Sequence, residues 1–515
     1  MKYDAIVVGA GSAGGIIAAR LSEDPGRSVL LLEAGPDYAD RSTLPDQIRY
    51  GYGTGLRGIE SVHNWSFKGV RNRSGGEVPI PRGRVVGGSS AVNGQIFLRG
   101  TPEDYDAWAA AGNDEWAFEK VLPYFRKLEN DTDFGGDFHG REGPIACRRF
   151  KRSEWLGPTV AFYDACRSNG FPDCPDHNAP DSTGVGPVPL NNPGRIRIST
   201  MIGYLDPARH RLNLTIRGGC QVKRIVFDGA CAVGVEVESG GATSVVYGEQ
   251  IILSAGPIGS PHLLMLSGIG PRDQLDGLGI AVIAERPGVG QNLRDHPSVL
   301  LTWRTRPDHP LDPSIYSDQL CLRYTATGSR LRNDMIIFMT SVAVDHDAIG
   351  TQPSEPIGVR MRARVNLALG AGQLRVVSLD PRVQPLIDYN FLSSEFDLVR
   401  LREAARISVR LASHPSFAPY LDSMVDPTEL DLASDDSLDE WLKRRVTHGH
   451  HISGTCRMGP ASDPMSVVDQ HGRIHGVDNL RVADASIMHD CIRANTNVTA
   501  MMIGERVASF MRAGS

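Results

Sequence analysis

The sequence lacks the long runs of residues that mark two large functional classes. Its 515 residues contain no uninterrupted apolar stretch near the about 18 residues that a membrane span requires. It has no long run of Lys or Arg, and its formal net charge of -6 opposes the attraction to phosphate on which nucleic-acid binders depend. We therefore expect a protein with no membrane span and no nucleic-acid partner.

The sequence also lacks closely spaced cysteines. Its eight cysteines are scattered, with no CxxC pair and no zinc-finger spacing, so we expect reduced and mostly buried thiols. The N-terminus shows no basic region followed by an apolar region and a cleavage site, and a strand pattern begins there at Tyr3. These absences predict a cytoplasmic location.

Glycine, in contrast, is abundant and clustered. The chain has 56 glycines, above the typical share of about 7%, and they gather in short motifs rather than in linkers. A chain of this length allows roughly two to four domains. Clustered glycines indicate that the backbone approaches a ligand closely.

The first glycine motif follows a short apolar run at residues 3–8. It reads GAGSAG at residues 9–14 and continues into a helical pattern that ends near Leu21. In such a strand, turn and helix, Gly9 permits the tight turn, Gly11 admits a pyrophosphate, and Gly14 lets the helix pack on the strand. A glycine turn that merely packs is the alternative, and the motif alone does not separate FAD from NAD.

An acidic residue supports the nucleotide interpretation. A second apolar run at residues 28–32 ends at Glu33. A carboxylate at the end of the second strand can accept hydrogen bonds from the adenosine ribose. We therefore predict a dinucleotide site in this part of the chain.

Later motifs resemble those of one family, the glucose-methanol-choline (GMC) oxidoreductases. They occur in the family's order and span most of the chain. They read GRVVGGSSAVN at residues 83–93 with PEDYD at 102–106, GPIGSPHLLMLSGIG at 256–270, PGVGQNL at 287–293, and HISGT at 451–455 with LRVADAS at 480–486 and NTN at 495–497.

The resemblance implies an α/β fold of two interleaved parts. A Rossmann-like FAD-binding domain would comprise residues 1–150, 212–300 and 446–515. An α+β substrate domain with a large antiparallel sheet would comprise residues 151–211 and 301–445. In the second domain we expect strands at 334–344 and 358–369 and an amphipathic helix at 395–413.

Together with the first glycine motif, the resemblance implies an FAD site built from both ends of the chain. Val222 would lie near the adenine, Asp484 and Ala485 near the pyrophosphate and ribityl chain, and Asn497 near the flavin pyrimidine edge. The predicted set is Gly9, Gly11, Ser12, Ala13, Gly14, Glu33, Ala34, Arg84, Val86, Gly87, Gly88, Ser89, Asn93, Gly94, Val222, Ala255, Gly256, Asp484, Ala485, Asn495 and Asn497.

The attachment of FAD is predicted from one position. Relatives that tether FAD use a histidine at the position that matches Val92. Valine cannot form that bond, so we expect noncovalent FAD.

The resemblance also implies a catalytic pair. The family's base is the histidine of an H-x-x-G-T pattern, which His451 satisfies, and a second residue downstream matches Asn495. Loss of hydride from an alcohol requires loss of the hydroxyl proton, for which histidine is a suitable base. The Asn495 amide can orient the substrate oxygen but cannot relay protons, and capping of the following helix is its structural alternative.

Three further positions near this pair are candidates for lining the substrate pocket. His450 occupies a position that is often aromatic in relatives, and Gly94 matches a position that faces the substrate. His448 is either a surface residue or a neighbour of the pocket. No i,i+4 or HExxH arrangement is present among these histidines, so we predict no metal. The absence of a G-x-S-x-G elbow gives no support to a serine hydrolase.

These features predict an FAD-dependent enzyme that oxidises a small-molecule, primary alcohol, with oxygen or another electron acceptor reoxidising the flavin. Two alternatives stay open, because fold does not determine function. One is a lyase on the same fold, such as an enzyme of cyanohydrin cleavage. The other is a flavin electron-transfer partner of a peptide-derived redox cofactor. The sequence does not identify the alcohol, the acceptor or the oligomeric state.

Overall fold

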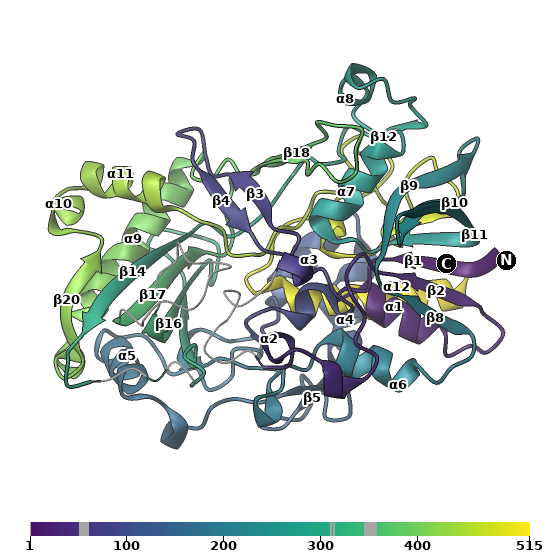
Figure 1. Ribbon diagram of the computed structural model, residues 1–515. Coiled ribbons are helices and arrows are strands. Elements are labelled where there is room, and N and C mark those ends of the chain that lie inside the picture. The colour runs from purple at the N-terminus through teal and green to yellow at the C-terminus, as the bar shows by residue number, and fades with distance from the viewer. Residues whose placement is uncertain (1, 51–60, 310–311, 313–314, 344–357, 515) are drawn as a thin grey trace.

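The computed structural model describes residues 2–50, 61–309, 312, 315–343 and 358–514. Two large sheets dominate the two ends of the molecule (Figure 1). One is a mostly parallel sheet whose strands come from residues 2–32, 214–253 and 480–482, and the other is an antiparallel sheet whose strands come from residues 184–187 and 298–426. This arrangement confirms the predicted α/β fold with a large antiparallel sheet.

The first sheet has seven strands in the order β8-β2-β1-β11-β10-β9, with β21 also pairing with β11. Besides pairing with β1, the long strand β11 pairs with two other strands: its first half is antiparallel to β10, and its last residues are parallel to β21. The strands are β1 (Lys2–Val8), β2 (Val29–Leu32), β8 (Leu214–Arg217), β9 (Cys220–Asp228), β10 (Cys231–Ser239), β11 (Ala242–Leu253) and β21 (Leu480–Val482).

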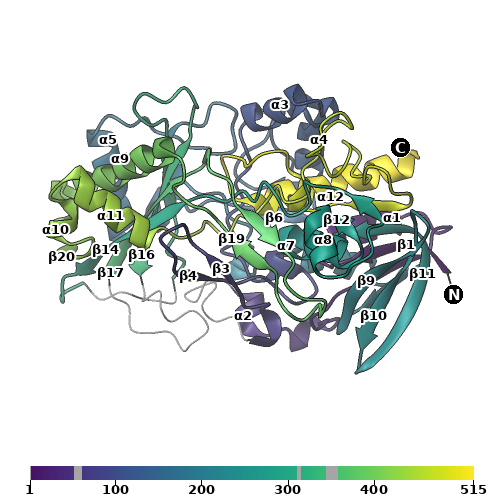
Figure 2. The same cartoon turned by 90° about the horizontal axis from the view of Figure 1, so that it is seen from above.

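Two helices join the ends of the chain beside this sheet. The predicted first helix is α1 (Gly14–Leu21), and it packs against the last helix, α12 (Thr496–Ala513) (Figures 1 and 2). The Arg20 guanidinium on α1 donates to the buried Glu505 carboxylate on α12, with Nε 2.9 Å from Oε1. The two ends of the chain therefore form one packed unit.

The second sheet has six antiparallel strands in the order β20-β14-β17-β16-β15-β7. The predicted strands correspond to β16 and β17 and the predicted helix to α9 (Glu395–Ala412), which packs on β14, β16 and β17; Val344 lies outside the described residues. The strands are β7 (Gly184–Pro187), β14 (Ser298–Thr305), β15 (Leu320–Tyr324), β16 (Met335–Ala343), β17 (Gly358–Val365) and β20 (Leu421–Asp426).

A third, four-stranded sheet crosses the predicted domain boundary. Its order is β18-β19-β3-β4, so strands from residues 67–80 join strands from residues 373–388. The predicted boundaries themselves stay a prediction. The strands are β3 (Phe67–Val70), β4 (Glu77–Ile80), β18 (Gln373–Arg375) and β19 (Leu386–Asp388).

The other helices surround these sheets. Among the described residues, no helix combines the length and the apolar character needed to cross a membrane. All eight cysteines are free thiols, and Cys231 alone is not fully buried. The helices are α2 (Asp46–Arg49), α3 (Pro102–Ala110), α4 (Phe118–Leu128), α5 (Gly157–Ser168), α6 (Asp206–Ala208), α7 (Gly256–Leu266), α8 (Arg272–Gly277), α10 (Glu429–Leu432) and α11 (Asp435–Arg445).

Candidate active site

A cavity of about 560 Å³ brings together residues from both large sheets and from both ends of the chain. Most of the predicted cofactor-binding residues line it. They are Gly9, Gly11, Ser12, Ala13, Glu33, Ala34, Gly88, Ser89, Asn93, Gly94, Val222, Ala255, Gly256, Asp484, Ala485, Asn495 and Asn497.

Two glycine turns form one wall of the cavity. A Cβ placed on Gly88 would lie 2.6 Å from the Gly11 Cα, so the two turns can pack this closely only with glycine at position 88. Gly9 has a positive φ of 99°, which a side chain would make unfavourable. These turns present bare backbone where an anionic cofactor is predicted.

Four predicted residues do not line the cavity. A Cβ on Gly14 would lie 2.0 Å from the Gly9 carbonyl oxygen, so Gly14 packs the helix onto the strand. The backbone N–H groups of Val86 and Gly87 donate to the carbonyl oxygens of Pro36 and Ala10, respectively. The Arg84 guanidinium lies over the ring of Trp65. The structure therefore places Gly14, Arg84, Val86 and Gly87 behind the wall, in support of it.

Glu33 lies at the end of β2 and faces the same cavity. Its carboxylate oxygens accept hydrogen bonds from the backbone N–H of Ala10 at 3.0 Å and of Gly35 at 2.9 Å. Burial raises the pKa of Glu33 to about 7, although these hydrogen bonds lower it. Val222 lines the cavity too, as expected for the nucleotide end.

Residues of the C-terminal segment form another part of the cavity wall. The Asn497 Oδ1 accepts a hydrogen bond from the Ser12 hydroxyl at 2.8 Å, which joins residues 485 positions apart. The Asn497 Nδ2 has no hydrogen-bond partner among the described residues, so it is a donor available to a ligand. Asp484 instead holds the protein together, because its carboxylate accepts from the Ser260 hydroxyl at 2.6 Å and from the Gly256 N–H at 2.9 Å.

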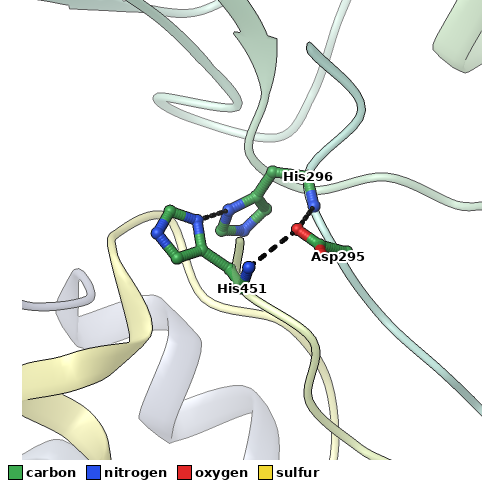
Figure 3. Close-up of side chains that lie close together, drawn as sticks. All are labelled: Asp295, His296 and His451. Carbon is green, nitrogen blue, oxygen red and sulfur yellow. Dashed lines mark hydrogen bonds between the residues drawn. The ribbon is translucent and has the colours of Figure 1, made fainter. Parts of the chain in front are cut away.

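The predicted base, His451, is paired with a histidine that we did not predict. The Nδ1 atoms of His451 and His296 lie 2.9 Å apart (Figure 3). The other ring nitrogen of His296, Nε2, lies 2.8 Å from the Ile492 carbonyl oxygen. Both histidines are buried.

These contacts determine the tautomer of each ring. A carbonyl oxygen accepts hydrogen bonds and cannot donate, so the His296 Nε2 carries the proton. The Nδ1 of a neutral His296 then accepts the proton of the His451 Nδ1–H. This leaves the lone pair of His451 on Nε2, which has no hydrogen-bond partner among the described residues.

The surroundings keep the two rings neutral. Burial, with the charge of Arg364 as the next cause, holds the pKa of His451 well below its usual value. Burial likewise lowers the pKa of His296 to about 3. The pair can therefore accept a proton at neutral pH without first having to lose one.

Asp295 orders the loop that carries His451. Its Oδ1 accepts hydrogen bonds from the backbone N–H of His296 at 2.7 Å, of Gly449 at 3.0 Å and of His451 at 3.0 Å. A Cβ on Gly449 would lie 2.9 Å from the His451 Nδ1, so glycine is required beside the ring. Asp295 thus holds the backbone of His451, the predicted base, in place.

Asp295, His296 and His451 also lie close enough together to hold a metal ion. Zinc binds histidine nitrogen at about 2.0 Å, which requires two ligating nitrogens to lie well apart. The facing Nδ1 atoms lie only 2.9 Å apart, a hydrogen-bond distance. The arrangement fits a hydrogen-bonded pair better than a metal centre.

The neighbouring histidines differ in position. His450 lines the cavity and has a positive φ of 66°, a strained conformation that often occurs at functional sites. His448 is buried behind it, with its Nε2 2.7 Å from the Pro79 carbonyl oxygen and its Nδ1 accepting from the His450 N–H. His448 is therefore neither a surface residue nor part of the cavity wall.

Asn495 and Gly94 both face the cavity. Asn495 is the N-cap residue of α12, but its side chain makes no capping hydrogen bond there, and its Oδ1 is buried without a partner among the described residues. A Cβ on Gly94 would meet no atom within 4 Å. Asn495 is thus free for a ligand, and the absent side chain of Gly94 leaves open space.

The residues missed from the sequence are Asp295, His296, Arg362 and Arg364. The histidine and the aspartate directly follow the motif at residues 287–293, so their position was the signal that could have found them. Arg362 and Arg364 lie on β17 and line the cavity. The apolar residues Trp303, Phe338 and Met339 on neighbouring strands of the same sheet are core residues outside the cavity lining.

The amino-acid sequence matches the models of one protein family and the sequences of individual relatives. Family models described as GMC oxidoreductase match residues 3–298 and 369–504. A GMC-type oxidoreductase of Rhodococcus erythropolis, described as uncharacterized, is 38% identical over 516 residues, covering 99% of this chain and 98% of that protein. Mitochondrial choline dehydrogenase of Homo sapiens is 34% identical, with coverage of 99% and 90%.

Solved structures agree with the sequence comparison. The crystal structure of pyridoxine 4-oxidase from Mesorbium loti superposes with a TM-score of 0.91 at 30% identity, covering 99% of each chain. Formate oxidase gives a TM-score of 0.90 at 24% identity, covering 100% of this chain and 98% of the other, a likeness that concerns the fold alone.

Proposed function

Because the chain belongs to the GMC oxidoreductase family, whose members are FAD-dependent enzymes that act on alcohols, we propose that it oxidises a primary alcohol to an aldehyde with noncovalently bound FAD. The observation that carries this proposal is the buried pair of His296 and His451, in which the lone pair of His451 lies on Nε2. This gives a neutral base in the wall of the cavity.

The cavity offers the groups that FAD requires. The Gly11 and Gly88 turns leave bare backbone for the pyrophosphate, Glu33 can accept from ribose hydroxyls, and the unpartnered Asn497 Nδ2 can donate to the flavin. When bound, FAD supplies the acceptor for a hydride and its two electrons. The protein residues supply position and proton transfer.

In the proposed reaction, His451 Nε2 accepts the proton of the alcohol hydroxyl as the alcohol carbon loses its hydride. The alcohol thereby loses two hydrogens and two electrons and becomes an aldehyde. His296 keeps the His451 ring in the tautomer that can accept this proton. The Asn495 amide, which no capping bond occupies, orients the substrate oxygen, and His450 and Gly94 shape the space around it.

The proposal of noncovalent FAD rests on Val92. Its side chain faces the cavity at the position where tethered relatives carry a histidine, and an aliphatic group cannot form that bond. Denaturation of the holoenzyme should therefore release the flavin into the supernatant. Flavin that stays with the precipitated protein would contradict this part of the proposal.

The reaction is tested by anaerobic mixing of the holoenzyme with primary alcohols while flavin absorbance is followed. We expect bleaching of the flavin together with one aldehyde per flavin, and recovery of the spectrum when oxygen or an artificial acceptor is admitted. Release of an aldehyde with the flavin spectrum unchanged would instead support a lyase. The rate of recovery with each acceptor separates an oxidase from a dehydrogenase.

A further inference from the structure

Strand β17 carries an alternating row of arginines towards the cavity. Arg360, Arg362 and Arg364 occupy every second position and so share one face of the strand. Arg360 is held outside the cavity, where its Nε donates to the Thr302 hydroxyl at 2.9 Å. Arg362 and Arg364 line the cavity itself.

Arg364 is a buried cation without an ionic partner. Only 1% of its surface is exposed, and it makes no hydrogen bond or ion pair with any described residue. The ring of Phe338 lies 5.1 Å from its guanidinium carbon and supports it on one side. Burial of a charge in this way is costly unless a partner compensates it.

The charges around Arg364 do not balance within the protein. Arg82 and Arg362 also line this end of the cavity. Two carboxylates oppose these three cations. Asp318 lines the cavity and accepts a hydrogen bond from the Thr340 hydroxyl, and Asp295, beside His451, acts through its charge on Arg82 and Arg364. Asp318 forms no ion pair with an arginine of the described chain. His450 and His451 are held neutral by burial. The substrate end of the cavity is therefore left with excess positive charge.

The predicted cofactor phosphates do not account for this charge. They are expected at the Gly11 and Gly88 turns, whereas the arginines lie on β17 of the antiparallel sheet, beside His451. A guanidinium group presents paired N–H donors that match a carboxylate or a phosphate. An anionic group of the substrate could supply the partner that Arg364 lacks among the described residues.

We propose that the alcohol oxidised by this site carries an oxyanion, a carboxylate or a phosphate, which Arg364 and Arg362 bind while the hydroxyl group lies at His451. This inference rests on the proposed function and names its substrate class. It also excludes choline, which the name of the human relative specifies, because three guanidinium groups would repel a quaternary ammonium.

The first test compares matched alcohols in anaerobic flavin reduction by the holoenzyme. The pairs are 4-(hydroxymethyl)benzoate with its neutral amide and 5-hydroxypentanoate with its neutral amide, together with 4-(hydroxymethyl)phenyl phosphate and choline. We expect an anion to exceed its neutral partner by roughly tenfold or more in the ratio of reduction rate to dissociation constant. Equal rates for amide and acid in both pairs, or choline as the best substrate, would overturn the inference.

The second test replaces the guanidinium. Arg364→Gln should lose roughly tenfold to hundredfold more activity with the preferred anion than with the neutral amide, and Arg364→Lys should keep part of the preference. Arg304→Gln is the matched control, because Arg304 is exposed on the neighbouring strand β14. Equal losses with acid and amide would mean that Arg364 serves the flavin or the fold, and would overturn the inference.

A binding measurement separates this inference from the proposed function. Benzoate and inorganic phosphate, which contain no alcohol, are titrated into the holoenzyme while the flavin spectrum is followed. We expect one of them to bind to the wild type and to Arg304→Gln, and to bind at least tenfold more weakly to Arg364→Gln. If no alcohol reduced the flavin, the proposed function would fail, and this measurement would still decide whether the site binds anions. Absence of binding by both anions would overturn the inference.

Discussion

Two buried histidines in this protein have different charges at neutral pH: His139 is a cation and His451 is neutral. His139 lies among carboxylates: its Nε2 is 2.8 Å from Asp176, and its Nδ1 is 3.2 Å from Asp131 and 3.3 Å from Glu129. Burial lowers its pKa, but the hydrogen bonds to these carboxylates outweigh that effect and raise the pKa of His139 to about 10. His451, beside His296 and Arg364, is instead neutral.

The difference shows that burial alone does not decide what a histidine does. His139 is as little exposed as His451, yet the carboxylates around it make it a cation at neutral pH that holds a structural network. Arg364 and the neutral His296 instead help to keep His451 uncharged, as a base requires. The charge of the neighbours, rather than the depth of burial, separates the structural histidine from the proposed catalytic one.

The largest effect on the rate of flavin reduction should follow removal of His451, the proposed base. His451→Ala should retain FAD but reduce it at least about 100-fold more slowly, the typical scale of a lost general base. Stopped-flow reduction under anaerobic conditions measures this, with the exposed His210→Ala as control. A near-normal rate would show that another group takes the proton. Asn495→Ala should do less damage, because its amide orients the substrate without accepting its proton.

Removal of the charged histidine should affect stability instead. His139→Gln removes the cation that Glu129, Asp131 and Asp176 share, although each carboxylate keeps an ion pair with Arg99 or Arg149. We expect a loss of roughly 3 kcal/mol in the free energy of unfolding. Flavin reduction by the folded variant should be unchanged. Urea unfolding and stopped-flow reduction measure the two effects, and a slowed reduction step with stability intact would reverse the comparison.

A smaller effect is expected from the residue that sets the tautomer. His296→Leu removes the acceptor for the His451 Nδ1–H and should slow flavin reduction about tenfold, by analogy with other outer partners of histidine. His296→Asn, whose amide oxygen can accept the same proton, should recover part of the rate. Equal rates for Leu and Asn, with an unchanged pH profile, would assign His296 a packing role.

The smallest effects concern pH, and they differ between His451, His139 and His296. With the pKa of His451 well below its usual value, the reduction rate should be flat between about pH 7 and pH 9. The pKa of His139 is raised to about 10, so its stabilisation is complete below about pH 6.5 and is lost as pH rises through 10. The pKa of His296 is lowered to about 3, so its neutral form destabilises the fold as pH falls below about 6.5.

These signs are checked by thermal unfolding across pH. The decline in midpoint between about pH 7 and pH 10 should be smaller in His139→Gln than in the wild type, because the variant has no raised pKa to titrate. The acid decline should remain, since His296 is still buried. A reduction rate that rises steadily from pH 7 to pH 9 would show that His451 is charged at neutral pH.

The local parts of the site could be predicted from the sequence. A strand, a glycine turn and a helix are encoded by neighbouring residues, and β1, the turn at Gly9 and α1 follow the predicted order. The motif at residues 451–455 likewise predicted a histidine that lines the cavity. What these predictions share is that each depends on a few consecutive residues.

The missed residues depend on contacts between distant segments. His296 contacts His451 across 155 positions, and although His296 follows the motif at residues 287–293, that motif does not indicate which residue it contacts. The alternation of arginine with apolar residues at 359–365 is typical of a strand with one face in water. In the structure Arg364 is buried and faces the cavity, so its role appears only with the tertiary fold.

The packing of α1 on α12 has a consequence for biosynthesis. The bonds between Ser12 and Asn497 and between Arg20 and Glu505 cannot form until the last helix has left the ribosome. The strand β1 must also wait for its partner β11, some 240 residues later in the chain. Loading of the cofactor is therefore expected late in synthesis. A nascent chain that stalls before α12 would present the glycine turn at residues 9–14 without Asn497, which completes the cavity beside it.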